Sequence, residues 1–271
     1  MNHDDLQVWS KRAADWAHGY HAGLRDVPVR APLVPGAIAA QLPGAAPEVG
    51  EPMEAIFADF ERIVPAGMTH WQHPRFFAYF PANAAPASML AEQLANAIAS
   101  QGMLWQTSPA ATEMEEVMIQ WLRAALGLPE GFLGTIHDSA TTATLSAVLT
   151  MREAALNWAG LQEGLSGQPR LRIYASAETH SSVDKAVRIA GIGQDNLVKI
   201  ATDAAHAMRP EALAAAIAAD RAAGFLPIGV VLCAGGNLDK IVLPDPRNPH
   251  GLVHRRMRLR RRINAQPRLP R

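Results

Sequence analysis

Residues 171–191, LRIYASAETHSSVDKAVRIAG, decide the fold class of this chain. The stretch opens on an apolar run, LRIYAS, which is typical of a short buried strand. A polar turn that contains His180 follows, and SSVDKAVRIAG then places apolar residues at helical spacing. A strand that leads through a short turn into a helix predicts one unit of a parallel sheet.

The same alternation recurs on both sides of this stretch. Apolar runs at 132–136, 197–200 and 227–233 are predicted strands, and ATTATLSAVLTMREAAL and RPEALAAAIAADRAAG are predicted helices. Four strands that alternate with three helices predict a parallel sheet with right-handed connections and with helices on both faces. The predicted fold class is therefore α/β.

Helices are also predicted before the sheet. LQVWSKRAADWAHGYHAGL and MEAIFADFERIV are amphipathic, and the proline-rich linker DVPVRAPLVPG separates them. We interpret residues 1–86 as an N-terminal helical arm with a loop, and residues 87–236 as the sheet domain, which begins with two more helices. His18 and His21 have a spacing that could hold a metal, but metal sites need further ligands, so we interpret them as surface or packing residues.

The last 35 residues differ chemically from the rest of the chain. Residues 237–271 contain ten basic residues against two acidic ones, together with five prolines and no helical or strand period. Six arginines between 255 and 262 could touch nucleic acid, but aromatic residues are not interleaved among them, so this function is only an alternative. We interpret this segment as a disordered basic tail or as the product of a shifted reading frame.

Composition limits the location and class of the protein. A chain of 271 residues that is 49% hydrophobic is able to bury a sizeable core. The longest alanine-rich run is interrupted by Arg209, Glu211 and Asp220, so no membrane span is predicted. The polar start MNHDDLQVWSKR does not resemble a signal peptide, and a single cysteine excludes a disulfide framework. We therefore expect a cytoplasmic protein.

Four blocks carry a resemblance to a known family. They are THWQHPRFFAYFPANAAPASMLAEQL, SPAATEMEEVMIQWL, HDSATTATLSAVLTMRE and AETHSSVDKA. Over residues 5–236 their order and spacing resemble the group II pyridoxal-phosphate decarboxylases, and most of all the aromatic-L-amino-acid decarboxylases. The resemblance implies a pyridoxal-phosphate-dependent transferase-like large domain of fold type I, here with an incomplete sheet. It also implies pyridoxal 5′-phosphate as cofactor, a homodimer, and the decarboxylation of an L-amino acid to the amine.

The resemblance assigns cofactor-binding roles to five residues. His180 matches the imidazole that stacks on the cofactor ring, and the others match the phosphate turn and a later strand: Ser139, Ala140, Thr141 and Cys233. Without the resemblance, the hydroxyls at 139 and 141 would be interpreted as helix caps and His180 as a core or capping histidine. Asp138 stands where the family usually has glycine, and a carboxylate beside a phosphate is expected to weaken its binding.

Six further residues match substrate-binding positions: Tyr79, Phe80, Pro81, Ala82, Gln101 and Met103. The first four lie in a loop that, in the family, helps to close the active site of the neighbouring subunit. Ala82 stands where threonine is common, and Gln101 and Met103 replace groups that are more apolar or aromatic in the aromatic-specific enzymes. The identity of the amino acid therefore stays open.

Two groups that the family chemistry needs are missing from the expected context. In the family, an acid in a D-A-A strand faces the pyridine nitrogen, and a lysine in an H-K motif carries the cofactor. The four lysines of this chain are Lys11, Lys185, Lys199 and Lys240, and none has that context. We therefore expect an inactive N-terminal fragment of such an enzyme. The alternative is a non-catalytic dimerisation or binding protein derived from the family.

Overall fold

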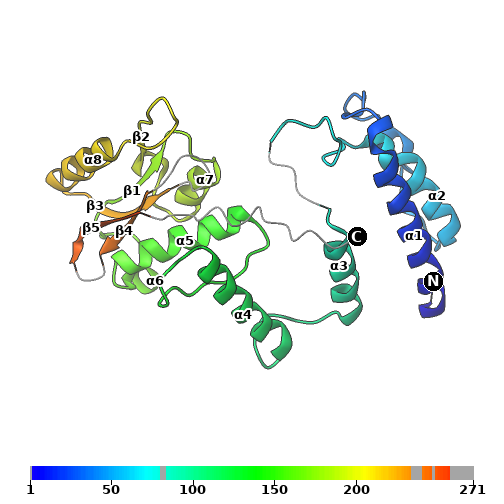
Figure 1. The fold of residues 1–271 in the computed structure, drawn as a ribbon, viewed down its shortest axis with the longest axis horizontal. Coiled ribbons are helices and arrows are strands. Elements are labelled where there is room, and N and C mark those ends of the chain that lie inside the picture. The colour runs from blue at the N-terminus through cyan, green and yellow to red at the C-terminus, as the bar shows by residue number, and fades with distance from the viewer. Residues whose placement is uncertain (1, 80–83, 233–239, 246–247, 257–271) are drawn as a thin grey trace, which may run out of the picture. The chain divides into compact units, whose positions relative to one another are not determined.

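The computed structural model describes residues 2–79, 84–232, 240–245 and 248–256 (Figure 1). The chain divides into two compact units, Met1–Ser100 and Gln101–Arg271. The boundary between the units falls after Ser100, one helix later than the boundary expected at residue 86. Among the helices of the described ranges, none combines the length and the apolar character that a bilayer crossing requires.

The N-terminal unit is helical. Its elements are α1 (His3–Gly23), η1 (Leu24–Asp26), η2 (Ala39–Gln41), α2 (Met53–Ile63), η3 (Pro65–Gly67) and α3 (Pro86–Ile98). Asn2 is the N-cap residue of helix α1, and its side chain accepts hydrogen bonds from the N–H groups of Asp4 and Asp5 in the first turn. Helices α1 and α2 pack through Trp16 and Phe60, whose ring centroids lie 4.8 Å apart. The predicted N-terminal helical arm is confirmed.

The C-terminal unit contains the sheet. Its elements are α4 (Pro109–Ala125), α5 (Ala140–Ala155), α6 (Ala159–Glu163), β1 (Leu171–Ser176), α7 (Ser182–Ile189), η4 (Gln194–Asn196), β2 (Leu197–Ile200), α8 (Pro210–Ala222), β3 (Leu226–Val231), β4 (Lys240–Asp245) and β5 (Asn248–Arg256). Strand β1 lies between β2 and β3 and is parallel to both, with Ile173 opposite Leu197 on one side and Gly229 on the other. The predicted parallel sheet is confirmed.

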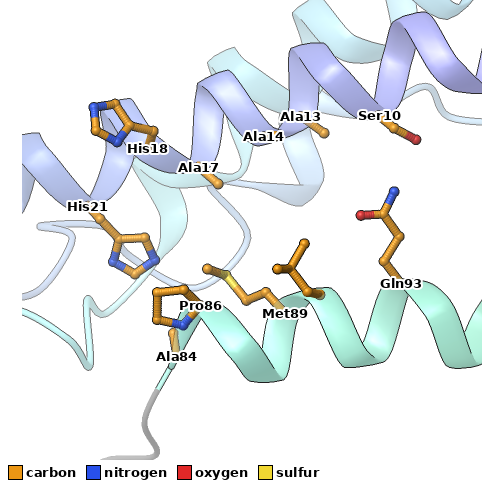
Figure 2. Close-up of a pocket in the computed structure, with 11 residues that line it drawn as sticks. Ser10, Ala13, Ala14, Ala17, His18, His21, Ala84, Pro86, Met89 and Gln93 are labelled. Atoms are coloured by element: carbon orange, nitrogen blue, oxygen red, sulfur yellow. The ribbon is translucent and has the colours of Figure 1, made fainter.

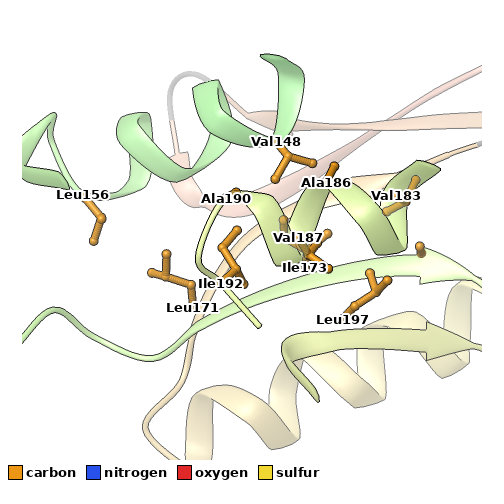
Figure 3. Packing of buried hydrophobic residues seen from close by; sticks show 11 residues of the cluster. Val148, Leu156, Leu171, Ile173, Val183, Ala186, Val187, Ala190, Ile192 and Leu197 are labelled. Atoms are coloured by element: carbon orange, nitrogen blue, oxygen red, sulfur yellow. The ribbon is translucent and has the colours of Figure 1, made fainter. Parts of the chain in front are cut away.

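Helices cover both faces of this three-stranded sheet. On one face, Ile173 of β1 packs in a cluster with Val148 of α5 and Val187 of α7 (Figure 3). On the other face, Tyr174 of β1 packs in a cluster with Leu213 of α8. Successive side chains of a strand point to opposite faces, so one apolar run supplies both clusters.

Helices α5 and α7 run side by side in the same direction. Figure 3 shows Val148 of α5 beside Ala186 of α7, and four residues further along each helix the guanidinium Nη1 of Arg152 donates to the carbonyl of Ala190 at 2.7 Å. Helix α7 begins just beyond the carboxyl end of β1. Because the two helices are parallel and in step, α5 also begins at the carboxyl edge of the sheet.

The run 132–136 was predicted as a strand, and this prediction is wrong. The structure gives it no regular secondary structure. The Thr135 hydroxyl and the Ile136 N–H instead donate to the carboxylate of Glu115 on α4. The Glu115 side chain therefore accepts the hydrogen bonds that a neighbouring strand would accept if this run were a strand.

The backbone of 240–245 and 248–256 forms an antiparallel pair of strands, β4 and β5, in which Leu243 is opposite Val253. Part of the segment that was expected to be disordered thus has regular structure. The paired positions include the apolar runs 241–243 and 252–253, which are too short to show a strand period amid prolines and arginines. Residues 257–271, with most of the arginine cluster, lie outside the described residues.

Candidate functional site

Two sequence-predicted features meet at the carboxyl edge of the parallel sheet. The turn that contains His180 follows β1, and the turn 137–139 precedes α5. The parallel course of α5 and α7 puts both turns at the same edge. In open α/β sheets this edge is where ligands bind.

The imidazole of His180 has a defined hydrogen-bonding state. Its Nδ1 accepts a hydrogen bond from the backbone N–H of Ser182 at 3.1 Å, so Nδ1 carries no proton. In the neutral ring the proton is then on Nε2. The side chain of His180 is exposed, so its ring face is accessible to a flat ligand.

A polar atom next to His180 was missed by sequence reasoning. Within the described part of the chain, the hydroxyl Oγ1 of Thr179 is buried and has no hydrogen-bond partner. Buried hydroxyls without a partner are uncommon in folded proteins, and this one lies in the turn directly after β1. Its only sequence signal is its position at the end of a strand.

The turn before α5 has the construction of an anion site. Ser139 is the N-cap residue, and its hydroxyl accepts from the backbone N–H of Thr142 at 3.3 Å. The N–H groups of Ala140 and Thr141 belong to the first turn, where no helical acceptor is within reach. These groups, the exposed Thr141 side chain and the positive end of the helix dipole suit a phosphate. The capping role of Ser139, the alternative left open by the sequence, is present as well.

Asp138 lies at the same turn. Its carboxylate accepts a hydrogen bond from the hydroxyl of Thr142. A negative charge is therefore held beside the N–H groups that fit a phosphate. Of the residues in this turn, Asp138 is the one that disagrees with the binding of an anion.

Glu115 of α4 is a second carboxylate close to this turn, and the sequence analysis did not identify it. Its Oε1 accepts from the Thr135 hydroxyl at 2.7 Å and from the Ile136 N–H at 2.6 Å. The hydrogen bond from the Ile136 N–H, then that from Thr135, holds the pKa of this carboxyl below its ordinary value. In the sequence, Glu115 stood out only as part of the block SPAATEMEEVMIQWL, which carries the family resemblance.

The predicted substrate loop is described as far as Tyr79. Tyr79 is exposed, has a left-handed backbone with φ of 54°, and stacks on Trp71 with 5.7 Å between ring centroids. Phe80, Pro81, Ala82 and Cys233 lie outside the described residues.

The other two predicted substrate residues, Gln101 and Met103, are exposed at the start of the C-terminal unit. The hydroxyl of Thr107 donates to the carbonyl of Gln101 at 2.6 Å, which fixes the backbone of this short loop. Tyr79 belongs to the N-terminal unit, whereas Gln101 and Met103 belong to the C-terminal unit.

A separate concavity of about 770 Å³ lies in the N-terminal unit, between α1 and α3. Figure 2 shows His21 of α1 pointing toward Pro86 of α3 across it. None of the predicted site residues lines it.

A search of the described residues finds no group of three or more His, Cys, Asp or Glu side chains that could hold a metal ion.

The lysines with described side chains have ordinary surface positions. The Nζ of Lys199 lies 2.9 Å from Oδ2 of Asp184 in an ion pair. Lys185 is exposed on α7 and Lys11 on α1. The side chain of Lys240 lies outside the described residues.

Comparisons with known proteins agree with this architecture. Residues 35–239 match the pyridoxal-dependent decarboxylase conserved domain. A phenylacetaldehyde synthase from Arabidopsis thaliana is 34% identical over 254 residues, which cover 91% of this chain and 51% of the relative. The aromatic-L-amino-acid decarboxylase of Rattus norvegicus is 39% identical, over 87% of this chain and 51% of the relative. The chain thus spans about half the length of these relatives.

Solved structures give the same result. The crystal structure of Oryza sativa TDC with PLP and tryptamine superposes with a TM-score of 0.78 at 32% identity, over 85% of this chain and 51% of that one. A 4-hydroxyphenylacetaldehyde synthase from Rhodiola rosea gives a TM-score of 0.78 at 34% identity, over 85% of this chain and 50% of that one. The domain match, which covers more than half of the chain, and the shared α/β architecture show that the chain belongs to the pyridoxal-dependent decarboxylase family, whose cofactor is pyridoxal 5′-phosphate.

Proposed function

We propose that this chain is the cofactor-binding part of a carboxy-lyase that removes CO₂ from an aromatic L-amino acid and leaves the amine. The observation that carries the proposal is the meeting of the His180 turn and the N-terminus of α5 at one edge of the parallel sheet. Similarity to aromatic-L-amino-acid decarboxylases and to a tryptophan decarboxylase supports the substrate class.

The N-terminus of α5 holds the phosphate of the cofactor. The N–H groups of Ala140 and Thr141 and the hydroxyls of Ser139 and Thr141 donate to its oxygens, and the helix dipole favours its charge. These donors belong to a helix of 16 residues that packs on the sheet, so they keep their positions without the ligand. This preorganisation lowers the entropy lost on binding.

His180 covers one face of the pyridine ring. When bound, this ring supplies the delocalised system that accepts the electron pair left by the departing CO₂. The Ser182 N–H fixes the orientation of the imidazole and leaves the proton on Nε2, where it is available as a donor. Cys233 is a further cofactor contact that we assign, and we assign Tyr79, Phe80, Pro81 and Ala82 to substrate binding in the active site of the neighbouring subunit, as the family resemblance implies.

We further propose that the chain by itself binds the cofactor without catalysing the reaction. Lys199 forms an ion pair with Asp184, and the side chain of Lys185 is exposed on α7, so neither has the context of the lysine that carries the cofactor in the family. The test is reduction with borohydride in the presence of pyridoxal 5′-phosphate, followed by peptide mapping. We expect no stoichiometric label on a lysine, and a label on one lysine together with amine release would overturn this point.

The proposed site is tested by cofactor binding. We expect the chain to bind pyridoxal 5′-phosphate more tightly than pyridoxal, because the donors of α5 recognise the phosphate. His180→Ala is expected to weaken the binding of both compounds by about tenfold, and His180→Phe to restore most of it, because a phenyl ring also stacks. The proposed site would be contradicted if His180→Ala bound each compound as tightly as wild type does, and if neither chain preferred pyridoxal 5′-phosphate over pyridoxal.

A second candidate function is non-catalytic association with a longer relative. It is favoured by the exposed apolar side chains of Leu90, Leu94 and Ile98 on α3. Co-expression with a full-length aromatic-L-amino-acid decarboxylase distinguishes the two candidates. A stable mixed complex whose formation does not depend on pyridoxal 5′-phosphate supports the second one.

A further inference from the structure

The stretch that leads into the phosphate turn is held by one side chain. Within 101–232, which the structure describes without a gap, the hydrogen bonds that tie residues 133–137 to another element both end on Oε1 of Glu115. One comes from a side-chain hydroxyl and the other from the backbone. Hydrogen bonds to an ionised carboxylate are shorter and stronger than those between neutral groups.

Close packing fixes the same stretch at a second point. A methyl group on Gly134 would lie 3.3 Å from Cγ2 of Ile119, which is tighter than ordinary van der Waals contact. Ile119 is four residues after Glu115, so both lie on the same face of α4. Gly134 and Ile136 therefore rest against one face of this helix, through a close contact and a pair of hydrogen bonds.

The held stretch ends three residues before the N-cap of α5. Ile136 is followed by His137, Asp138 and then Ser139, the N-cap residue. Three residues span at most about 10 Å of chain, so an anchor at Ile136 limits where the backbone can enter the turn.

We propose that Glu115 is a positioning residue for cofactor binding, which acts by anchoring the chain that enters the phosphate turn. The inference rests on the proposed function, since it assigns the phosphate to the N-terminus of α5. Glu115 itself does not touch the phosphate, because a carboxylate would repel it. It holds Thr135 and Ile136 so that the N–H groups of Ala140 and Thr141 stay aligned.

The experiment compares the affinities of pyridoxal 5′-phosphate and pyridoxal for four forms of the whole chain, measured by fluorescence titration. The forms are wild type, Glu115→Gln, Thr135→Val and Glu116→Gln. Glu116 is an exposed glutamate on the same helix, so its variant is a control with the same change of charge. Circular dichroism of each form reports whether the fold is kept.

We expect Glu115→Gln, whose neutral amide oxygen accepts both hydrogen bonds more weakly than the ionised carboxylate, to weaken binding of pyridoxal 5′-phosphate about tenfold and to leave that of pyridoxal within about twofold of wild type. Thr135→Val, which removes one of the two donors, is expected to give a smaller loss of the same kind. Glu116→Gln is expected to match wild type. The phosphate-dependent loss is a readout that a general loss of stability would not give.

Two results would overturn the positioning role and leave the proposed function standing. In the first, Glu115→Gln binds pyridoxal 5′-phosphate and pyridoxal as tightly as wild type does. In the second, Glu115→Gln loses the same factor of affinity for both compounds. If Glu115→Gln does not fold, the test relies on Thr135→Val. A Thr135→Val chain that prefers pyridoxal 5′-phosphate over pyridoxal by the same factor as wild type would overturn the positioning role. A wild-type chain that binds both compounds equally would instead refute the phosphate site, and with it the proposed function and this inference together.

Discussion

The hydroxyl of Thr142 donates a hydrogen bond to the carboxylate of Asp138 across the first turn of α5. The contact stabilises the helix, because a negative charge near its N-terminus interacts favourably with the helix dipole. The same carboxylate lies close to the N–H groups of Ala140 and Thr141, to which we assign the phosphate, and its negative charge repels that of the phosphate. Helix capping and cofactor binding therefore compete at this turn.

Asp138→Asn is expected to tighten binding of pyridoxal 5′-phosphate by about threefold to tenfold, because it removes a like charge at short range. The amide oxygen of asparagine still accepts from Thr142, so the cap is kept. Binding of pyridoxal, which lacks the phosphate, should not change. Glu130→Gln, at an exposed acid after α4, is the control. Unchanged or weaker phosphate binding by Asp138→Asn would show that this carboxylate does not oppose the ligand.

The anchor at Glu115 predicts a pH dependence. Its pKa lies below the ordinary value of 4.5, because the Ile136 N–H and the Thr135 hydroxyl bond to the ionised form. The stability that this contact contributes is therefore present above pH 4.5 and is lost as the pH falls through the lowered pKa. The difference in Tm between wild type and Glu115→Gln should be constant near neutral pH and should shrink in acid. A difference that grows in acid would contradict the assignment.

The parallel sheet could be predicted because its signals are local. In LRIYAS, Ile173 and Tyr174 are both fully buried, on opposite faces, and a continuous apolar run is the pattern of a strand that helices cover on both sides. The turn with His180 was predicted for the same reason, since it directly follows that strand. Both features depend on residues that are neighbours in the sequence.

The contacts of Glu115 could not be predicted in this way. Its partners Thr135 and Ile136 lie 20 and 21 residues away in the sequence, and their hydroxyl and N–H groups carry no pattern that names a carboxylate. The same contacts explain the wrong strand at 132–136, because the apolar run there suggested pairing with another strand. Asp138 was recognised as unusual, but its bond to Thr142 depends on side-chain rotamers.

Tyr174 predicts a measurable contribution to stability. Its side chain is fully buried, and its hydroxyl donates to Oδ2 of Asp220 at 2.8 Å. Tyr174→Phe leaves that carboxylate oxygen without its donor and should reduce the free energy of unfolding by about 1–3 kcal/mol, measured by urea denaturation. Arg172, whose Nε lies 3.3 Å from Oδ1 of Asp220, still offsets part of the charge.

The same contact should respond to alkali. Burial, then the hydrogen bond to Asp220, raises the pKa of Tyr174 above its ordinary value of 10. A raised pKa means that the contribution is complete below pH 10 and is lost as the pH rises through the pKa of the folded state. The difference between wild type and Tyr174→Phe should therefore be constant at neutral pH and decrease in strong alkali. An equal difference at all pH values would contradict this.

From the exposed apolar residues of α3 we predict self-association of the chain. Leu90, Leu94 and Ile98 are spaced four residues apart and are 62%, 64% and 75% exposed, so they form one apolar stripe. Exposed stripes of this kind favour association in water, because contact between two of them removes apolar surface from solvent. We expect the wild-type chain to bind the dye ANS and to elute from a sizing column as oligomers or aggregates.

Leu94→Glu places a charge in the stripe and should reduce both effects, whereas Gln93→Glu adds the same charge one position away and should change them less. If the wild-type chain is monomeric and does not bind ANS, or if the two variants are equal, the stripe is not the surface that drives association.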